Sequence, residues 1–274
     1  VRDVSDLSVL RIISVVTVAS LASQLFIYLA SYSLPKGQAL CISLLLPLLP
    51  AFQIYSKWAT VFPYAFVCLL SLWATNLWIK RKYFLATFFL FTSFLIYQPA
   101  ALFGCSLALV VCMQSPEYLS IKKFALWNLS VFSVSTLLSL VINFVLKVPS
   151  KSRTQPISNL HDLQDKILWL TTRPLPLSLR PFVIDSPSLS SLVIYFAFLA
   201  ALSPLLFFKL NTHGRLDLQK AWGLYFVFFI ISSIPLFVIR ENQIEFRTLP
   251  AQSVIGLIFL IRLISLALSY CFGT

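Results

Sequence analysis

The sequence predicts an all-α integral membrane protein, a polytopic bundle of about nine transmembrane helices with one long outer loop that carries an amphipathic helix. Hydrophobic residues make up 59% of the chain and charged residues only 11%, whereas soluble domains carry about 25% charged residues. The mean hydropathy is +0.88. Apolar stretches recur from end to end of the chain, so residues 1–274 are expected to form a single membrane domain.

The charge balance is strongly basic. Twenty-one Lys and Arg residues against nine Asp and Glu residues give a formal net charge of +12, which in a soluble domain would indicate a nucleic-acid partner. The basic residues lie instead in short connectors between apolar stretches, where Lys and Arg set the orientation of membrane spans. We therefore expect a lipid bilayer as partner and no nucleic acid. The cysteines lack CxxC spacing and the histidines lack neighbours at metal-ligand spacing, so no metal or other cofactor is expected.

A bilayer core requires about 20 apolar residues per helix. The predicted spans are residues 8–32, 39–55, 61–79, 83–97, 99–113, 124–146, 189–208, 222–239 and 251–270. The stretch 85–113 reads either as one kinked helix or as two short helices broken at Gln98-Pro99. Two helices place the basic groups 80–82 and 122–123 on the same side, as the positive-inside tendency favours, and Pro99 disfavours helix at Gln98.

With two helices in this stretch and the basic groups on the cytoplasmic side, the N-terminus and the long connector 147–188 are expected outside the cell. Within the connector, Leu160, Leu163, Ile167 and Leu170 recur at helical spacing and predict an amphipathic helix on the membrane surface. The chain starts with a valine followed by polar residues, so we expect an N-terminal part of the protein to precede it.

Polar side chains gather on the predicted outer face, in four stretches that would share one membrane level. These stretches are residues 2–11, 50–59, 97–99 and 240–248. In the first stretch, Asp3 and Asp6 are either acids that suit the start of a helix or catalytic carboxylates.

The stretch 240–248 holds two arginines, two carboxylates, an Asn, a Gln and a Thr. One interpretation is a solvated connector between two spans. The other is a site for an anionic head group, in which Arg240 or Arg247 binds a phosphate and Glu241 orients the arginine. Arg262 lies within the last predicted span, where a charge should pair or face a cavity, and the sequence identifies no partner for it.

The two remaining stretches also allow two interpretations each. Tyr97 and Gln98 form either a helix-breaking turn only, or a turn from which Gln98 hydrogen-bonds a sugar hydroxyl. Lys57 and Trp58 form either an interfacial anchor, or a tryptophan platform for a sugar ring with Lys57 near a phosphate. Gln53 belongs to the same polar stretch.

Taken together, these residues resemble the bacterial Gtr-type glucosyltransferase family, within the GT-C superfamily of polytopic membrane glycosyltransferases. The resemblance lies in residues 2–11 before a span, Pro50-Ala51-Phe52-Gln53 with Trp58 after the next span, Tyr97-Gln98-Pro99-Ala100 at a helix break, and Glu241 with Arg247-Thr248 before the last span. These motifs cover most of the chain in order, and each is short.

The resemblance implies an inner-membrane enzyme that moves a sugar from a polyprenyl-phosphate carrier to a cell-envelope glycan or lipid-linked acceptor, as in O-antigen modification. Such a transfer requires a carboxylate to deprotonate the acceptor hydroxyl and cations to hold the departing phosphate. The family's acid lies in a loop that this chain enters late, so Asp3 and Asp6 are its nearest candidates here. Two other classes stay open: a transporter or flippase for a lipid-linked or hydrophobic solute, and a polytopic scaffold without catalysis.

Overall fold

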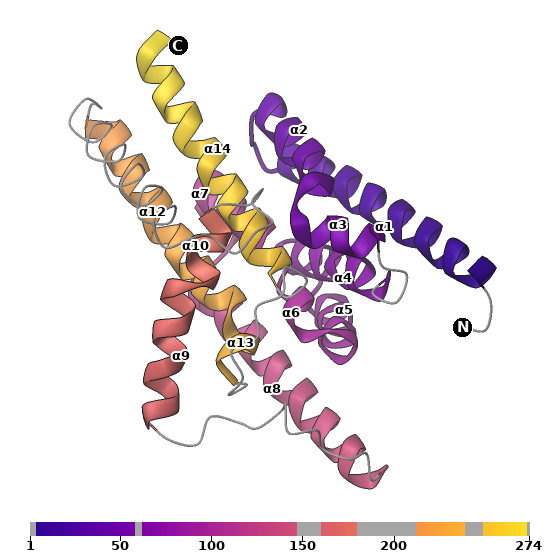
Figure 1. Ribbon diagram of the computed structural model, residues 1–274. Coiled ribbons are helices and arrows are strands. Elements are labelled where there is room, and N and C mark those ends of the chain that lie inside the picture. The colour runs from indigo at the N-terminus through magenta and orange to yellow at the C-terminus, as the bar shows by residue number, and fades with distance from the viewer. Residues whose placement is uncertain (1–3, 58–61, 147–159, 180–211, 239–248, 273–274) are drawn as a thin grey trace.

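The computed structural model describes residues 4–57, 62–146, 160–179, 212–238 and 249–272 (Figure 1). Its α-helices are α1 (Val4–Ser31), α2 (Lys36–Leu45), α3 (Pro50–Lys57), α4 (Phe62–Ile79), α5 (Tyr83–Ile96), α6 (Gln98–Ala101), α7 (Cys105–Gln114), α8 (Ile121–Val145), α9 (Leu160–Thr172), α10 (Pro174–Leu179), α12 (Thr212–Ser232), α13 (Ile234–Val238) and α14 (Pro250–Phe272). Short 3-10 helices follow α2 and α7, namely η1 (Leu46–Leu48) and η3 (Pro116–Tyr118). No strand occurs in these ranges, which confirms the all-α class for the described residues.

Three helices of the described chain are long and apolar enough to cross a membrane. They are Ser8–Ser31 within α1, Ile121–Ile142 within α8 and Pro250–Ser269 within α14. These helices match the predicted spans 8–32, 124–146 and 251–270. The protein buries 28% of the apolar window in α1 and in α8, but 56% of the window in α14. The first two helices are therefore peripheral, and α14 is central.

The outward surfaces of the peripheral helices are strongly apolar. Val9, Ile12 and Val16 are exposed on α1, and Val141 and Phe144 are exposed on α8, where 86% of Phe144 is accessible. Exposure of such side chains to water costs about 25 cal/mol per Å² of apolar surface, a cost that lipid removes. These faces therefore favour contact with acyl chains.

The expected count of about nine spans is wrong for the described residues. The long helices number three, or four if the bent pair Lys36–Leu48 and Pro50–Lys57 is one broken span, with a bend of 51°. Pro47 and Pro50 lack the N–H groups that would continue the helix, which explains this bend. The α5 and α7 helices, with 14 and 10 residues, rise about 21 and 15 Å, less than the ~30 Å bilayer core. The predicted span 189–208 lies outside the described residues.

The helix break predicted at Gln98 is confirmed, and it lies one residue earlier, at Tyr97. Tyr97 is extended, with φ −159° and ψ 102°, and separates α5 from the short α6. Pro99 lies in the first turn of α6, where its missing N–H costs no hydrogen bond.

The turn between α6 and α7 is joined to α4. The Ser71 hydroxyl donates to the Ala101 carbonyl and accepts a 2.8 Å hydrogen bond from the Gly104 N–H. A Cβ at Gly104 would lie only 2.0 Å from Thr75 Oγ1, so glycine alone permits this approach.

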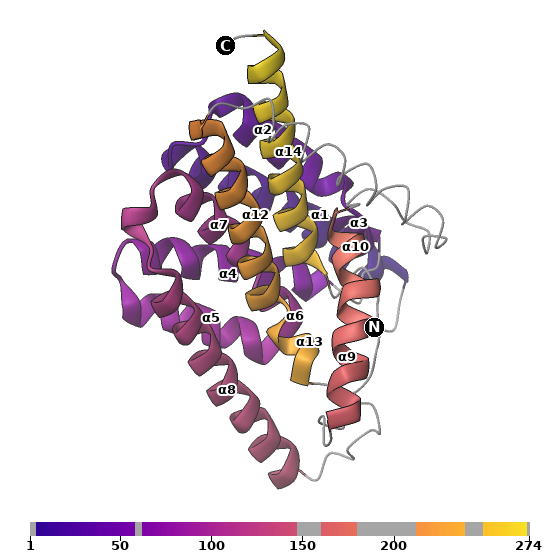
Figure 2. The same ribbon diagram turned by 90° about the vertical axis from the view of Figure 1, so that its left-hand side faces the viewer.

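The α12 and α14 helices lie side by side and antiparallel in both views (Figures 1 and 2). The α7 helix packs against both of them and against α4, and most of its residues are buried in the main hydrophobic core, to which α1, α2, α3, α5 and α8 also contribute. The α12 helix starts at Thr212 and ends at Ser232, which makes the predicted span 222–239 too short at its start and too long at its end. Its first turns carry Asp217 and Lys220.

The amphipathic helix predicted in the connector 147–188 forms as α9. Its predicted apolar stripe is divided, because Leu170 is buried whereas Leu163 and Ile167 are 38% and 51% exposed. The exposed pair suits a helix whose apolar face meets lipid. Lys166, which the pattern places on the polar face, is instead buried.

Candidate functional site

Gln53, Lys57, Tyr97 and Gln98 are the predicted site residues whose side chains the structure describes. Asp6 lies in the first turns of α1, and its side chain lies outside the described part of the chain. The other predicted site residues also fall outside the described ranges; they are Asp3, Trp58, Arg240, Glu241 and Arg247.

A row of tyrosine rings joins two of the four predicted polar stretches. Tyr55 of α3 meets Tyr64 of α4 edge to face, with ring centroids 5.7 Å apart. Tyr64 in turn stacks on Tyr97, with centroids 3.7 Å apart and planes inclined by 8°. The structure thus places the stretches 50–57 and 97–98 beside the start of α4. Because α6 also lies here, we call this end of the helix bundle the α6 end.

Gln53 and Lys57 lie on the exposed side of α3, opposite the fully buried Tyr55. The Gln53 amide donates a 2.8 Å hydrogen bond to the Leu48 carbonyl and so caps η1. The Ser14 hydroxyl donates to the Tyr55 carbonyl, which ties α3 to α1. Lys57, in the last turn of α3, is therefore held in place by its helix while its own side chain remains accessible.

Gln98 is half-buried at the helix break. Its amide nitrogen donates a 3.2 Å hydrogen bond to the Thr136 hydroxyl of α8. This contact fixes the side chain between α6 and α8, and it gives Gln98 a structural role that the sequence did not predict.

The two helices on either side of the polar stretch 240–248 meet this same end of the bundle. The helices on either side of it, α13 and α14, both contact α6, and α14 also contacts α3. Leu236 and Leu249 flank the stretch and belong to one small buried cluster with Leu170 of α9 and Leu177 of α10. The described residues that flank the stretch therefore lie together, close to α6, α9 and α10.

Lys166 is the residue that sequence reasoning missed. It is 1% exposed, although lysine is rarely buried without a partner. Its Nζ lies 4.3 Å from the centre of the Trp169 ring, a cation–π contact, and Trp169 packs on the Leu236 and Leu249 cluster. The only signal in the sequence is the spacing of Lys166, Trp169 and Leu170, which share one helix face at i, i+3 and i+4.

A buried amide lies near the start of α14. Gln252 is 1% exposed, and its Nε2 donates a 2.8 Å hydrogen bond to the Ser232 carbonyl at the end of α12. Its Oε1 accepts no hydrogen bond within the described residues. Because an unsatisfied buried acceptor costs about 1–3 kcal/mol, this oxygen is suited to accept a hydrogen bond from the hydroxyl group of a small molecule or from water.

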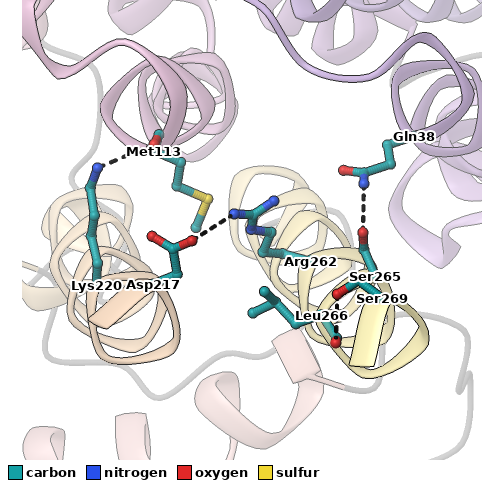
Figure 3. A network of polar contacts seen from close by, with 8 residues as sticks. All are labelled: Gln38, Met113, Asp217, Lys220, Arg262, Ser265, Leu266 and Ser269. Atoms are coloured by element: carbon teal, nitrogen blue, oxygen red, sulfur yellow. Dashed lines mark hydrogen bonds and ion pairs between the residues drawn. The ribbon is translucent and has the colours of Figure 1, made fainter. Parts of the chain in front are cut away.

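The opposite end of the bundle, where α1, α4 and α7 finish, holds a second polar group (Figure 3). Arg262, for which the sequence offered no partner, pairs with Asp217 of α12 at 3.6 Å. Lys220 donates a 3.2 Å hydrogen bond to the Met113 carbonyl at the end of α7. Gln38 of α2 donates to the Ser265 hydroxyl at 2.8 Å, so these contacts connect α2, α7, α12 and α14.

Comparisons with protein-family models, with curated proteins and with solved structures find no match for this chain.

His161 and Asp165 form a 3.1 Å pair on the exposed side of α9. Among the described residues, no group of three or more His, Cys, Asp or Glu side chains is placed to hold a metal ion. The candidate site at the α6 end thus consists of Lys57, Gln98, Lys166 and Gln252 with the aromatic row beside them.

Proposed function

We propose that the chain is a membrane glycosyltransferase, or the larger C-terminal part of one, of the Gtr type. It moves a sugar from a polyprenyl-phosphate carrier to a cell-envelope glycan or lipid-linked acceptor on the outer face of a bacterial inner membrane. The observation that carries this proposal is the Tyr55, Tyr64 and Tyr97 row, which joins two polar stretches at the end where the stretch 240–248 starts and finishes.

The cations required for a departing phosphate are available at this end. Lys166 is a buried lysine beside the cluster that contains Leu236 and Leu249, the residues on either side of the stretch 240–248. In the proposal, Lys166 and Arg247 hold the polyprenyl phosphate, because charge-assisted bonds are strongest where water is excluded. Arg240 assists, and Glu241 orients one of the two arginines.

The sugar and its acceptor require hydrogen-bonding groups and a base. Gln98 and Gln252 supply amides at the helix break and at the start of α14, where sugar hydroxyls can donate to the free Gln252 oxygen. Lys57 is the last residue of α3 and Trp58 is the next residue in the sequence, and in the proposal they provide a cation and a ring face. Asp3 or Asp6 serves as the base that deprotonates the acceptor hydroxyl.

The test is sugar transfer by the full chain in proteoliposomes, with radiolabelled polyprenyl-phosphate glucose as donor and a lipid-linked glycan as acceptor. Arg247→Ala and Lys166→Met should each lower the rate about tenfold or more, because each removes a charge-assisted bond to phosphate. The matched control is Lys122→Ala, which removes an exposed lysine from the first turn of α8. Circular dichroism and elution volume establish that each variant is folded. Absence of transfer by the wild type, or wild-type rates in both variants, would contradict the proposal.

A transporter or flippase for a lipid-linked or hydrophobic solute is the second candidate. It is favoured by helices broken at Leu49 and Tyr97 and by Arg262 within a candidate span, features that transporters use at their binding sites. A fluorescent polyprenyl-phosphate sugar in the same proteoliposomes separates the two candidates. Movement across the bilayer without a chemical product supports the transporter, whereas a labelled acceptor supports the enzyme.

A further inference from the structure

A cavity of about 510 Å³ lies at the end of the bundle opposite the aromatic row. Tyr64 stands near the start of α4 and this cavity lies at its other end, past Ile79, so the two sites are roughly 22 Å apart along the helix. Its volume falls in the range of about 300–1,000 Å³ that is usual for small-molecule sites. The cavity is therefore separate from the proposed sugar-transfer site.

About half of the cavity lining is polar, in a chain that has few polar residues. Hydroxyl and charged side chains surround it, including Ser31, Tyr32, Ser33, Lys80, Glu117 and Tyr118. Among the residues that the structure describes, the lining holds one cation, Lys80, and one carboxylate, Glu117. A ligand with a single charge would be attracted by one of these groups and repelled by the other, so the pair favours a zwitterion.

The helix ends around the cavity favour a cation in the part near Glu117. The α1, α4 and α7 helices finish here, and each helix C-terminus carries roughly half a negative charge. Lys220 already donates to the Met113 carbonyl at the end of α7, as expected for a cation near such an end. The rings of Tyr32 and Tyr118 can add cation–π attraction for an ammonium group.

The walls of the cavity are held in place before any ligand binds. The Tyr32 hydroxyl donates a 3.0 Å hydrogen bond to Asn76 Oδ1 and so fixes the ring against α4. Ser33 and Arg81 both adopt left-handed backbone conformations, with φ of 65° and 60°, in the turns that close α1 and α4. Residues other than glycine seldom adopt this conformation, so two such turns beside one cavity indicate that its shape is specified.

Exposed apolar side chains lie on α1, which ends at the cavity, and on α2, which packs against α1. Ile27, one turn before Ser31, is 51% exposed, and Leu40 and Leu44 of α2 are 48% and 65% exposed. Acyl chains can lie along these side chains while a polar headgroup enters the cavity. This continuity favours a lipid over a free soluble molecule.

We propose that this cavity binds the headgroup of an aminophospholipid, with Glu117 on its ammonium group and Lys80 on its phosphate. Phosphatidylethanolamine has this chemistry, because its headgroup links a phosphate to a primary ammonium. Phosphatidylcholine lacks the N–H donors that Glu117 requires, and phosphatidylglycerol lacks the ammonium altogether.

The experiment is calorimetric titration of the detergent-solubilised full chain with dihexanoyl-phosphatidylethanolamine, -phosphatidylcholine and -phosphatidylglycerol. The ethanolamine lipid should bind about tenfold more tightly than either of the others, as a charged hydrogen bond provides. Glu117→Gln and Lys80→Gln should each remove most of this preference. Lys82→Gln, which makes the same charge change outside the lining, should preserve it.

Equal affinity for the three lipids, or equal effects of Glu117→Gln and Lys82→Gln, would overturn the proposal. Preference for phosphatidylglycerol would also overturn it, since this result indicates a simple anion site. A last titration uses soluble glycerophosphoethanolamine, which has the same headgroup but no acyl chains. If it binds as tightly as the lipid, the lipid is not the ligand; much weaker binding supports a lipid held partly by its chains. None of these outcomes depends on sugar transfer.

Discussion

The ring of Tyr64 lies almost parallel to the ring of Tyr97, with 3.7 Å between their centroids. Tyr64 belongs to α4, whereas Tyr97 is the extended residue at which the chain leaves α5 and enters α6. The pair therefore sets the position of the helix break relative to α4, and through Tyr55 it sets the position of α3.

Tyr64→Ala should lower the free energy of unfolding by about 2 kcal/mol, because it removes a half-buried ring and a stacked pair that contributes about 0.5–1.5 kcal/mol beyond its area. Denaturation in detergent micelles, followed by circular dichroism, measures the change. Tyr64→Phe keeps the ring and should stay within about 0.5 kcal/mol of wild type. Equal losses in both variants would show that the stack contributes nothing.

Gly104→Ala should destabilise the protein by about 1–3 kcal/mol or more, because an added methyl overpacks the contact between α7 and α4. The new Cβ would lie 2.0 Å from Thr75 Oγ1 and 2.6 Å from the Ser71 carbonyl oxygen. Gly223→Ala is the matched control, since nothing lies within 4 Å of a Cβ there. That change should stabilise α12 by about 0.5–1 kcal/mol. A neutral Gly104→Ala would refute the close approach.

A double-mutant cycle of Asp217→Ala and Arg262→Ala should give a coupling energy of about 0.5–1 kcal/mol. The value is modest because the two side chains are 53% and 25% exposed and their charges are partly screened. The same cycle with Asp217→Ala and Lys220→Ala should give almost none, because Lys220 bonds to the Met113 carbonyl instead. Zero coupling in the first cycle would show that the ion pair between Asp217 and Arg262 does not contribute to stability.

Stability should fall as the pH rises from about 10 to about 12, and Tyr32 should account for part of the fall. Burial, with the phenols of Tyr28 and Tyr118 nearby, raises the pKa of Tyr32 from 10.0 to about 12. The unfolded chain therefore loses this proton first, so the stabilisation is complete below pH 10 and is lost by about pH 12. Tyr32→Phe should flatten this part of the pH profile in denaturation experiments. An unchanged slope would show that Tyr32 does not contribute.

The long helices were predictable because their signal is local. A run of apolar residues long enough for a bilayer marks 8–32, 124–146 and 251–270, and Pro99 marks the break beside Tyr97. The number of spans was not predictable in the same way. Apolar composition does not reveal where Pro47, Pro50 and the contact at Gly104 interrupt a helix, so it predicts full spans where the helices are short.

The residues missed at the two polar ends depend on contacts between distant parts of the chain. Arg262 finds its partner in Asp217, which belongs to another helix. Lys166 is buried because α9 turns its Lys166, Trp169 and Leu170 face toward α10 and α13. A hydrophobic pattern read along one helix favours the Leu163 and Ile167 side instead, since those residues are more apolar.

The double hydrogen bond of Ser71 restricts how this protein can move. Its hydroxyl bridges the Ala101 carbonyl and the Gly104 N–H across the turn after α6, so that turn cannot straighten without losing both bonds. The turn between α6 and α7 is thus a fixed corner rather than a hinge. A movement that keeps both bonds carries this turn together with α4, whereas the 51° bend before α3 is not tied by them.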